Sequence, residues 1–268
     1  MSLIDIGANL THRSFEKDLS DVLDRAKAAN VSHIIVTGSD LESSIESTQL
    51  SKQSPNYLSA TAGVHPHNSK DCKNQHWEKI SELCLTREVV AVGECGLDYN
   101  RNFSPRKIQR EIFRKHLELA SQINKPLFLH QRDAHEDFYN LLRECSSTDL
   151  SGVVHCFTDS EKALRDYLDL GLFIGITGWI CDDKRGEELR RIVSFIPKDL
   201  LLIETDAPYL LPKNISPKPN SNRNEPCYLN IVVSMIAECS NQSKSEIAQQ
   251  TRLNAAKLFS LPALLSAD

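Results

Sequence analysis

The stretch VVAVGECGLD, from Val89 to Asp98, decides how the fold is predicted. It opens with an uninterrupted apolar run, which is typical of a parallel strand that is buried on both faces. The run stops at Gly93, and a carboxylate, Glu94, follows at once. We therefore predict a strand over Val89–Gly93 that carries a polar side chain just beyond its carboxyl end.

The same arrangement is repeated along the chain, where short apolar runs alternate with longer stretches of helical pattern. The other expected strands are Leu3–Ile6, His33–Thr37, Leu58–Val64, Pro126–His130, Val153–Phe157, Leu172–Ile176 and Leu200–Thr205. The expected helices are Ser14–Ala29, Leu41–Lys52, Gln75–Leu85, Pro105–Ile123, His135–Cys145, Ser160–Leu170, Gly186–Phe195 and Tyr228–Cys239. Eight strand–helix repeats in 268 residues predict an α/β fold of the (β/α)8 TIM-barrel class, with one domain over residues 1–268. An open doubly wound sheet has a similar strand content and is the alternative.

Local signals mark two helix ends and one long irregular stretch. Ser104 is expected to cap a helix whose first residue is Pro105. Gly171 is expected to end a helix just before the next strand. The irregular stretch runs from Ala207 to Pro226, and segments of that length in a compact domain are usually functional or disordered.

Composition narrows the class of protein. The apolar share of 40% and the charged share of 25% are typical of a globular chain. A net charge of -5 argues against an extended basic surface for duplex DNA, although a nuclease can hold a few phosphates without one. None of the eight cysteines forms a C-x-x-C pair, which indicates reduced thiols in a cytoplasmic protein. We see no signal-peptide pattern and no run of about 18 apolar residues, so we expect no contact with a membrane.

Polar side chains stand at the ends of five of the expected strands. They are His65, Glu94, His130, His155 and Asp206, and Glu204 precedes the last of them by two residues. In a (β/α)8 barrel the carboxyl ends of the strands form the active-site face, so we expect these side chains to gather there. Each histidine taken singly could equally be a hydrogen-bonded core residue, because a buried polar group needs a partner. The set as a whole is better explained by a metal site.

Carboxylate and imidazole ligands suit a divalent ion such as Mg, Mn or Zn. A bound cation lowers the pKa of its water and neutralises charge on a phosphoryl oxygen. An acidic residue near that water can take its proton. Asp206 suits either role, as a metal ligand or as this base, and the residues alone leave the choice open.

Five further residues are candidates to contact a substrate. Arg132 and Asp133 follow the fifth strand, where Arg132 could grip a phosphate, and a plain surface ion pair is the alternative. Arg223 could reach the site, or its loop could simply be anchored by its own hydrogen bonds. Trp179 could stack on a base or pack in the core. His67 could contact substrate or lie in an exposed turn.

The ordered motifs of the chain are DIGANLT (5–11), AGVHPH (62–67), VGECGLD (92–98), HQRDA (130–134), HCFT (155–158), IGITGW (174–179), IETDAPYLL (203–211), PKP (217–219) and RNEP (223–226). Together they resemble the TatD family of metal-dependent deoxyribonucleases, within the amidohydrolase-like barrels. The resemblance runs from Ile4 to about Leu261. A set of ordered motifs is far more specific than any single one.

The resemblance implies a (β/α)8 fold and metal-assisted phosphodiester hydrolysis. By motif, the residues that look like metal ligands are Glu94, His130, His155 and Asp206. His65 looks like a residue that contacts substrate or metal-bound water. The implied activity is a Mg-dependent 3′–5′ exonuclease that prefers single-stranded DNA, with some action on RNA, in DNA repair or degradation. We expect a monomer that acts on nucleic-acid ends.

The chain departs from the family in its first motif. Most members open with D-x-H-x-H, whose two histidines complete a second metal site. The matching residues here are Asp5, Gly7 and Asn9. The chain resembles in this respect the branch of the family that contains bacterial TatD itself. We therefore expect one tightly bound ion, with a second, weaker ion near Glu94 and Asp206 only in the presence of substrate phosphate.

Two other functions compete with the nuclease. The same ligands could activate water to hydrolyse an ester, an amide or an aminoacyl-tRNA linkage. Arginines near the expected site, Arg132 and Arg223, favour phosphodiesters over these bonds. A non-catalytic binding module on an enzyme scaffold is the third hypothesis, motivated by the missing histidines, and it predicts no metal-dependent turnover.

Overall fold

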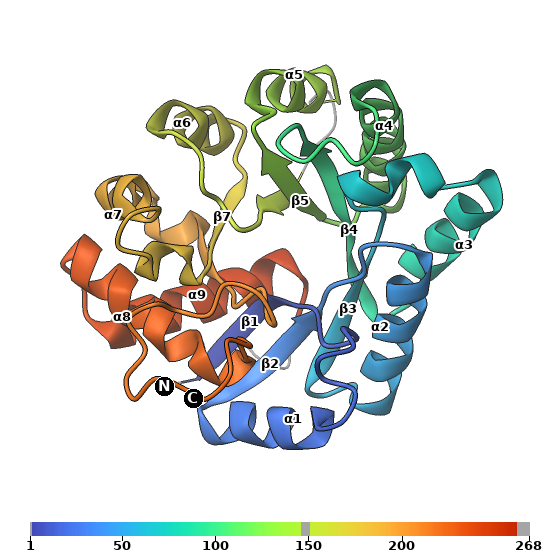
Figure 1. Ribbon diagram of the computed structural model, residues 1–268. Coiled ribbons are helices and arrows are strands. Elements are labelled where there is room, and N and C mark those ends of the chain that lie inside the picture. The colour runs from blue at the N-terminus through green and yellow to red at the C-terminus, as the bar shows by residue number, and fades with distance from the viewer. Residues whose placement is uncertain (1, 146–150, 262–268) are drawn as a thin grey trace. The chain divides into compact units, whose positions relative to one another are not determined.

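The computed structural model describes residues 2–145 and 151–261 (Figure 1). Its strands are β1 (Leu3–Ala8), β2 (Val31–Val36), β3 (Leu58–Ala62), β4 (Val89–Asp98), β5 (Leu127–Arg132), β6 (Gly152–Val154), β7 (Phe173–Ile176) and β8 (Leu201–Ile203). The sheet follows the order of the chain from β1 to β8, and the registered pairs are parallel. Strand order and direction are those of the predicted (β/α)8 class rather than of a doubly wound sheet.

The α-helices of the described residues alternate with these strands. They are α1 (Leu19–Ala28), α2 (Leu41–Gln53), α3 (Asn74–Cys84), α4 (Arg106–Ile123), α5 (His135–Cys145), α6 (Glu161–Asp169), α7 (Glu187–Ile192), α8 (Leu229–Ser240) and α9 (Lys244–Leu258). Short 3-10 helices are η1 (Pro66–Asp71), η2 (Gly178–Cys181), η3 (Val193–Phe195), η4 (Lys198–Leu200) and η5 (Pro226–Tyr228). The chain groups into two compact units. Of the described residues, the first unit comprises 2–35, 156–164 and 174–261, and the second comprises 36–145, 151–155 and 165–173.

The second unit contains β3 to β6 as successive parallel strands, and α2, α3 and α4 pack against β3 and β4 (Figure 1). β4 runs five residues beyond the predicted end at Gly93. A bulge explains the difference, because the pairing with β5 skips Glu94 and resumes at Cys95. Pairing then continues to Asp98, which lies opposite Arg132. The bulge re-aims Glu94 and keeps the remainder of β4 in the sheet.

The first unit contains β7 paired with β8, and Ala8 at the end of β1 forms a parallel bridge with Ala207 just after β8. Helix α9 packs against β1 and β8, and the sequence analysis did not predict it. Its buried face includes polar residues such as Thr251, Arg252 and Asn254, so the apolar period of an amphipathic helix is weak. The capping box of Ser243 and Glu246 was the available signal.

Two predicted helix starts were wrong. Helix α1 begins at Leu19 and not at Ser14, because the preceding residues form turns in which the amide of Asp18 donates to the carbonyl of Phe15. The N-cap of α4 is Pro105 itself, with no side-chain cap. The hydroxyl of Ser104 donates instead to the carbonyl of His67. The expected glycine at the end of α6 is confirmed, since Gly171 adopts φ 73° and its amide donates to Leu168.

The thiols and the apolar segments agree with the sequence analysis within the described residues. Free cysteines are recorded at positions 72, 84, 95, 156, 181, 227 and 239. Burial raises the pKa of Cys84 and of Cys181 to about 12, so these two thiols stay protonated at neutral pH. Among residues 2–145 and 151–261, no helix combines the length and the apolarity that crossing a membrane requires.

Candidate metal centre

Three imidazoles of the second unit converge on one carboxylate oxygen. Oε1 of Glu94 lies 2.9 Å from Nε2 of His155, 3.0 Å from Nδ1 of His130 and 3.4 Å from Nε2 of His65. All four residues were selected from the sequence because each stands at or near the end of an expected strand. The second unit brings them together around Glu94.

Backbone hydrogen bonds fix the position of each side chain. Glu94 is the bulged residue of β4, and its amide donates to the carbonyl of Gly38. His65 follows β3 and caps η1, where its Nδ1 accepts from the amide of His67 and leaves Nε2 turned toward Glu94. The amide of His155 donates to Leu129 in β5. Loop and strand ends of the sheet therefore hold the cluster rigidly.

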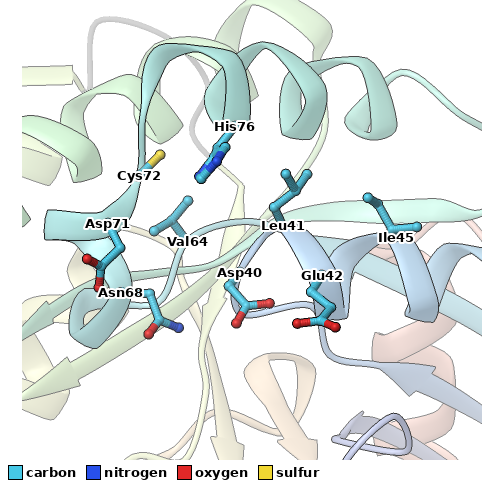
Figure 2. A pocket seen from close by; sticks show the side chains of 9 residues that line it. All are labelled: Asp40, Leu41, Glu42, Ile45, Val64, Asn68, Asp71, Cys72 and His76. Atoms are coloured by element: carbon cyan, nitrogen blue, oxygen red, sulfur yellow. The ribbon is translucent and has the colours of Figure 1, made fainter.

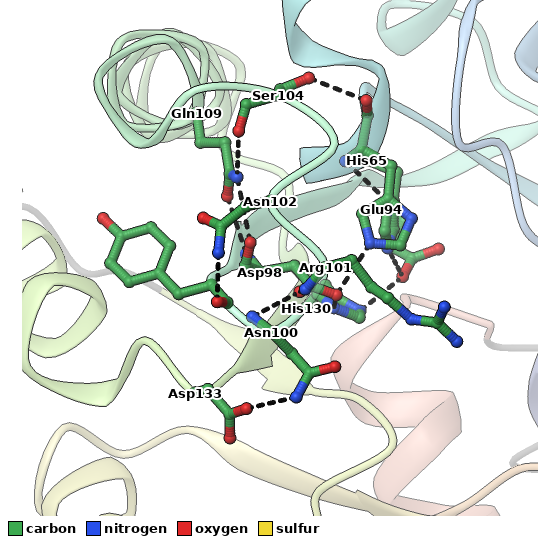
Figure 3. A network of polar contacts seen from close by, with 12 residues as sticks. His65, Glu94, Asp98, Asn100, Arg101, Asn102, Ser104, Gln109, His130 and Asp133 are labelled. Carbon is green, nitrogen blue, oxygen red and sulfur yellow. Dashed lines mark hydrogen bonds and ion pairs between the residues drawn. The ribbon is translucent and has the colours of Figure 1, made fainter.

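A second carboxylate, Asp98, supports the cluster (Figure 3). Its Oδ2 lies 2.9 Å from Nε2 of His67 and 3.4 Å from Nε2 of His130. Its Oδ1 accepts hydrogen bonds from the amides of Asn100 and Arg101 at 3.0 and 2.8 Å. Asp98 is almost fully buried, at 1% exposure, so these donors replace the water that its charge would otherwise need. It thereby orients two of the imidazoles.

Asp98 had no role in the sequence analysis, because the expected strand stopped at Gly93. The continued strand would have revealed it. Beyond the bulge, residues two apart share a face of the strand, so Asp98 lies on the same face as Gly96. The side chain of Gln109 in α4 fixes this end of β4, since it accepts from the amide of Asp98 and donates to its carbonyl.

The electrostatics of the cluster favour negative carboxylates. Burial would raise the pKa of Glu94, but electrostatic interaction with the surrounding imidazoles and the hydrogen bonds from His130 and His155 hold that pKa well below its usual value. Burial acts likewise on Asp98, and the imidazoles of His130 and His67 beside it lower its pKa strongly. Burial lowers the pKa of His65 to about 3 in spite of the nearby Glu94. His65 is thus a neutral imidazole at physiological pH, which is the form that binds a metal.

The donor set fits a divalent ion. One ligand atom each from His65, Glu94 and His130 lie within 4.8 Å of one another. Nε2 of His130 is buried, and its 3.4 Å approach to Oδ2 of Asp98 is not a hydrogen bond. A buried nitrogen without a hydrogen bond is costly, and a bound cation would satisfy it. Two nitrogens and a carboxylate oxygen are ligands that Mn, Zn and related ions accept. The cluster has the composition and the spacing of a divalent metal site.

Asp206 lies in the first unit, just after β8, with φ 53°. Its Oδ1 accepts from Nδ2 of Asn9 at 3.0 Å, and the same nitrogen also donates to the carbonyl of Ala207 at 3.3 Å. Asn9, the last residue of the departure noted in the first motif, thus orients Asp206. Glu204, also noted in the sequence, accepts from the amide of Cys156 at 2.5 Å.

The residues that were expected to contact a substrate have different surroundings. His67 bonds Asp98, as described above. Asp133 accepts from Nδ2 of Asn100 at 2.6 Å, and among the described residues no ion pair is recorded for Arg132. Arg132 is the last residue of β5 and so lies two residues beyond His130 in the same strand.

Arg223 is engaged within the first unit. It donates to both carboxylate oxygens of Asp18 at 2.8 and 2.7 Å, to Glu225 at 2.7 Å and to the carbonyl of Ser14 at 2.6 Å. Its guanidinium carbon also lies 5.0 Å above the ring of Phe15. These contacts favour the interpretation in which Arg223 anchors its own loop, because its donors are already occupied.

An exposed aromatic ring beside the cluster was not foreseen. Phe103 is 54% exposed and its ring lies edge-on to His67, with 4.8 Å between the centroids. A single phenylalanine in a loop gives no periodic signal, so the sequence offered no way to select it. A ring in this position can stack on a base.

A pocket of about 510 Å³ is lined by residues of α2, η1 and α3 (Figure 2). Val64 and Asn68 form part of its wall, and Leu41 and Ile45 of α2 add apolar surface. Carboxylates line it as well, namely Asp40, Glu42 and Asp71. Their negative charge makes this pocket unsuitable for a phosphate chain.

Comparison with known proteins agrees with the motifs. Residues 4–260 match the family described as TatD related DNase. The 3′–5′ ssDNA/RNA exonuclease TatD of Erwinia tasmaniensis is 45% identical over 259 residues, which cover 97% of this chain and 100% of the relative. The protein of the same name from Pectobacterium atrosepticum is 46% identical over 259 residues, with the same two coverages.

Solved structures share the fold. The TatD homologue YjjV of Escherichia coli K12 has a TM-score of 0.87 at 28% identity and covers 96% of this chain and 98% of its own. A TatD family hydrolase of Entamoeba histolytica has a TM-score of 0.85 at 28% identity, with 97% and 98% covered. The phosphotriesterase homology protein of Escherichia coli has a TM-score of 0.67 at 11% identity, with 96% and 98% covered, and this likeness concerns the fold alone. The fold is that of the TatD and amidohydrolase-like TIM barrels.

Proposed function

Because this chain belongs to the TatD family of DNases, we propose that it is a metal-dependent 3′–5′ exonuclease acting on single-stranded DNA and RNA. It is a hydrolase of phosphodiester bonds, and the convergence of three imidazoles on Glu94 is the observation that carries the metal dependence. Full-length relatives named as 3′–5′ ssDNA/RNA exonucleases support the substrate and the polarity.

The metal ligands that we propose are Glu94, His130, His155 and Asp206, and the position of His65 adds it as a further candidate. We propose one tightly held ion, Mg in the working enzyme, with Mn or Zn as substitutes. When bound, such an ion supplies Lewis-acid chemistry, since it activates water and neutralises phosphate charge. The two histidines that complete a second site in other members are replaced by Gly7 and Asn9, so a second ion would be weak.

Side chains of the protein would orient the imidazoles and accept the proton of the attacking water. Asp98 holds His130 and His67 in place, and the low pKa of its carboxyl keeps that hold over the physiological pH range. Asp206, whose carboxylate is oriented by Asn9, is proposed as the base that takes a proton from the attacking water. Arg132, Asp133, Phe103 and Trp179 are proposed contacts to the substrate. Arg223 is the weakest of the substrate candidates, because its donors are occupied.

The sequence and the relatives also support a proposal for the domain organisation, the compartment and the oligomeric state of the protein. Relatives that match 97% of this chain over 100% of their own length support a single functional domain over residues 1–268. Reduced cysteines support a cytoplasmic enzyme. We propose that it acts as a monomer on single-stranded ends in DNA repair or degradation.

The test replaces the central carboxylate. Glu94→Gln keeps the shape of the side chain but removes the negative charge on which the imidazoles converge, so we expect at least ~100-fold slower metal-dependent cleavage. Digestion of an oligonucleotide labelled at either end measures both rate and polarity, with and without a chelator. Glu238→Gln on α8 makes the same chemical change at an exposed position and serves as the matched control.

Three outcomes would contradict the proposal. One is cleavage by Glu94→Gln at the rate of the Glu238→Gln control. A second is activity that survives excess chelator. The third is faster turnover of simple esters, lactones or aminoacyl-tRNA than of the oligonucleotide, which would assign the same site to acyl transfer.

A further inference from the structure

The first unit contains a second concave site that the metal centre does not use. It has a volume of about 370 Å³, within the range of roughly 300–1,000 Å³ that ligand sites occupy. One wall is the turn after β7 with Gly178 and Trp179, and the other is the proline-rich segment after β8, from Leu210 to Asn222. We call it the Trp179 groove.

Close backbone packing builds this groove. A Cβ atom at Gly178 would collide with the carbonyl oxygen of Leu210, so only glycine lets the proline-rich segment approach the turn. Tyr209 in the same segment donates its amide to the carbonyl of Asp206. One wall of the groove therefore continues directly from the residue that we propose as base.

The charge of the groove is opposite to that of the whole chain. Its charged lining residues are Arg185, Lys213, Lys218 and Asp182. Asp182 is satisfied by Arg185, whose Nε and Nη2 lie 3.0 and 2.8 Å from one oxygen of the carboxylate. Lys213 and Lys218 are exposed, and no ion pair is recorded for either one within residues 2–145 and 151–261. In a protein of net charge -5, two uncompensated lysines in one groove point to an anionic ligand.

An aromatic platform lies in the same groove. The guanidinium of Arg185 lies 4.4 Å from the ring centroid of Trp179, and the indole N–H donates to the carbonyl of Arg185 at 3.0 Å. The indole is therefore held at a fixed angle and is half-buried rather than packed into the core. Proteins bind single-stranded nucleic acid without regard to sequence by placing cationic side chains along its phosphate backbone and aromatic rings against its bases.

We propose that the Trp179 groove, whose wall continues from Asp206 within the first unit, binds the single-stranded nucleic acid chain of the substrate, with Lys213 and Lys218 on its phosphates and Trp179 against a base. This inference rests on the proposed nuclease function and adds a substrate subsite to it. The carboxylate-lined pocket beside His65 has the wrong charge for the same chain. A groove of this kind makes turnover depend on the length of the substrate.

The experiment separates binding from cleavage. The double variant Lys213→Ala/Lys218→Ala is compared with Lys244→Ala/Lys257→Ala, which removes the same charge from exposed positions of α9. Fluorescence anisotropy of a labelled single-stranded oligonucleotide in chelator gives affinity over a salt series. We expect at least ~10-fold weaker binding at low salt and a salt slope smaller by ~1.4, because each phosphate of a single strand that a lysine neutralises adds about 0.7 to the slope.

Cleavage then provides the second measurement. In the presence of metal, kcat/KM is measured on a trinucleotide and on a long oligonucleotide, and we expect the loss in the groove variant to grow with length. Equal affinity and equal salt slope in the two double variants would overturn the proposal. So would a loss in kcat/KM that is the same for both substrates. A wild-type enzyme that binds the strand in chelator but never cleaves it with metal would sink the nuclease assignment and leave the groove standing.

Discussion

At the scale of single residues, the candidate centre depends on a carboxylate that touches no substrate in our proposal. Asp98 bonds His67 and approaches His130, and it is itself held by two backbone amides. A carboxylate that orients a metal-binding imidazole raises the basicity of that ligand and fixes its tautomer. Asp98 is therefore a positioning residue, and its removal should weaken the metal before it affects the chemistry.

We expect Asp98→Asn to lower metal affinity by ~10- to 100-fold, because the amide cannot provide the negative charge that holds both imidazoles. Titration calorimetry measures the affinity directly. Activity should return when the metal concentration is raised, which a residue acting in catalysis would not show. Asn100→Ala, which disturbs the same loop without touching the imidazoles, is the control. Reduced activity that excess metal fails to restore would argue against the positioning role.

The site residues were predictable where a polar side chain closes an apolar run. His65, Glu94, His130 and His155 were all selected in this way, and the second unit places them within a few ångströms of one another. Phe103 was not predictable, since its contact with His67 joins a loop to another element. The occupied donors of Arg223 were also invisible, because Asp18 lies about two hundred residues away in the sequence.

At the scale of elements, β4 shows how a glycine-rich strand can be misjudged. The apolar run stops at Gly93, and the predicted strand therefore ended there. A glycine in a strand usually weakens it, in agreement with such an end. Glycine here permits a bulge instead, since Gly93 adopts φ 143° just before the bulged Glu94. Farther along the strand, Gly96 adopts φ 141° and lies against the carbonyl of His130. The bulge aims Glu94 and the continued pairing delivers Asp98, so one irregular strand supplies both carboxylates of the centre.

Gly96→Ala should therefore destabilise the protein by at least ~2 kcal/mol, because the methyl group would collide with the carbonyl oxygen of His130 and the φ angle is unfavourable for alanine. Urea unfolding followed by circular dichroism measures the change. Gly171→Ala is the matched control, since it also has positive φ but meets no atom within 4 Å. That control should lose only ~1 kcal/mol. Equal losses of stability in the two variants would show that the positive φ angle alone causes the loss and that the close approach of β5 contributes nothing.

At the scale of the whole molecule, the strand order was predictable because each parallel strand reads as a separate apolar run. Helix α9 was not predictable, because its buried face includes polar residues. Asn254, for example, is buried and donates hydrogen bonds to the carbonyls of Lys198 and Leu201. Polar burial of this kind depends on the partner and leaves no period in the sequence. The same holds for Asp5, a carboxylate inside the first strand, and its burial has a consequence for the stability of the entire fold.

Asp5 is fully buried in β1, where it accepts hydrogen bonds from the amides of Gly7 and Thr205 and from the hydroxyl of Thr205. Burial raises its pKa from 3.8 to about 7, in spite of these bonds. The folded protein thus binds this proton more tightly than the unfolded chain does. The resulting contribution to stability is complete below pH ~4 and is lost as the pH rises through ~7, with a limiting size of up to ~4 kcal/mol.

Asp5→Asn removes this titration while it keeps a buried polar side chain of the same size. We expect the free energy of unfolding of the wild type to fall more steeply than that of Asp5→Asn between pH 5 and pH 8, measured by urea unfolding without metal. His65 acts in the opposite sense, because its lowered pKa of about 3 makes stability rise with pH up to ~6.5. Since His65 is present in both proteins, the difference between the two pH profiles isolates Asp5. Parallel profiles would mean that Asp5 is already ionised in the folded protein at pH 5, held by Thr205 more strongly than burial opposes it.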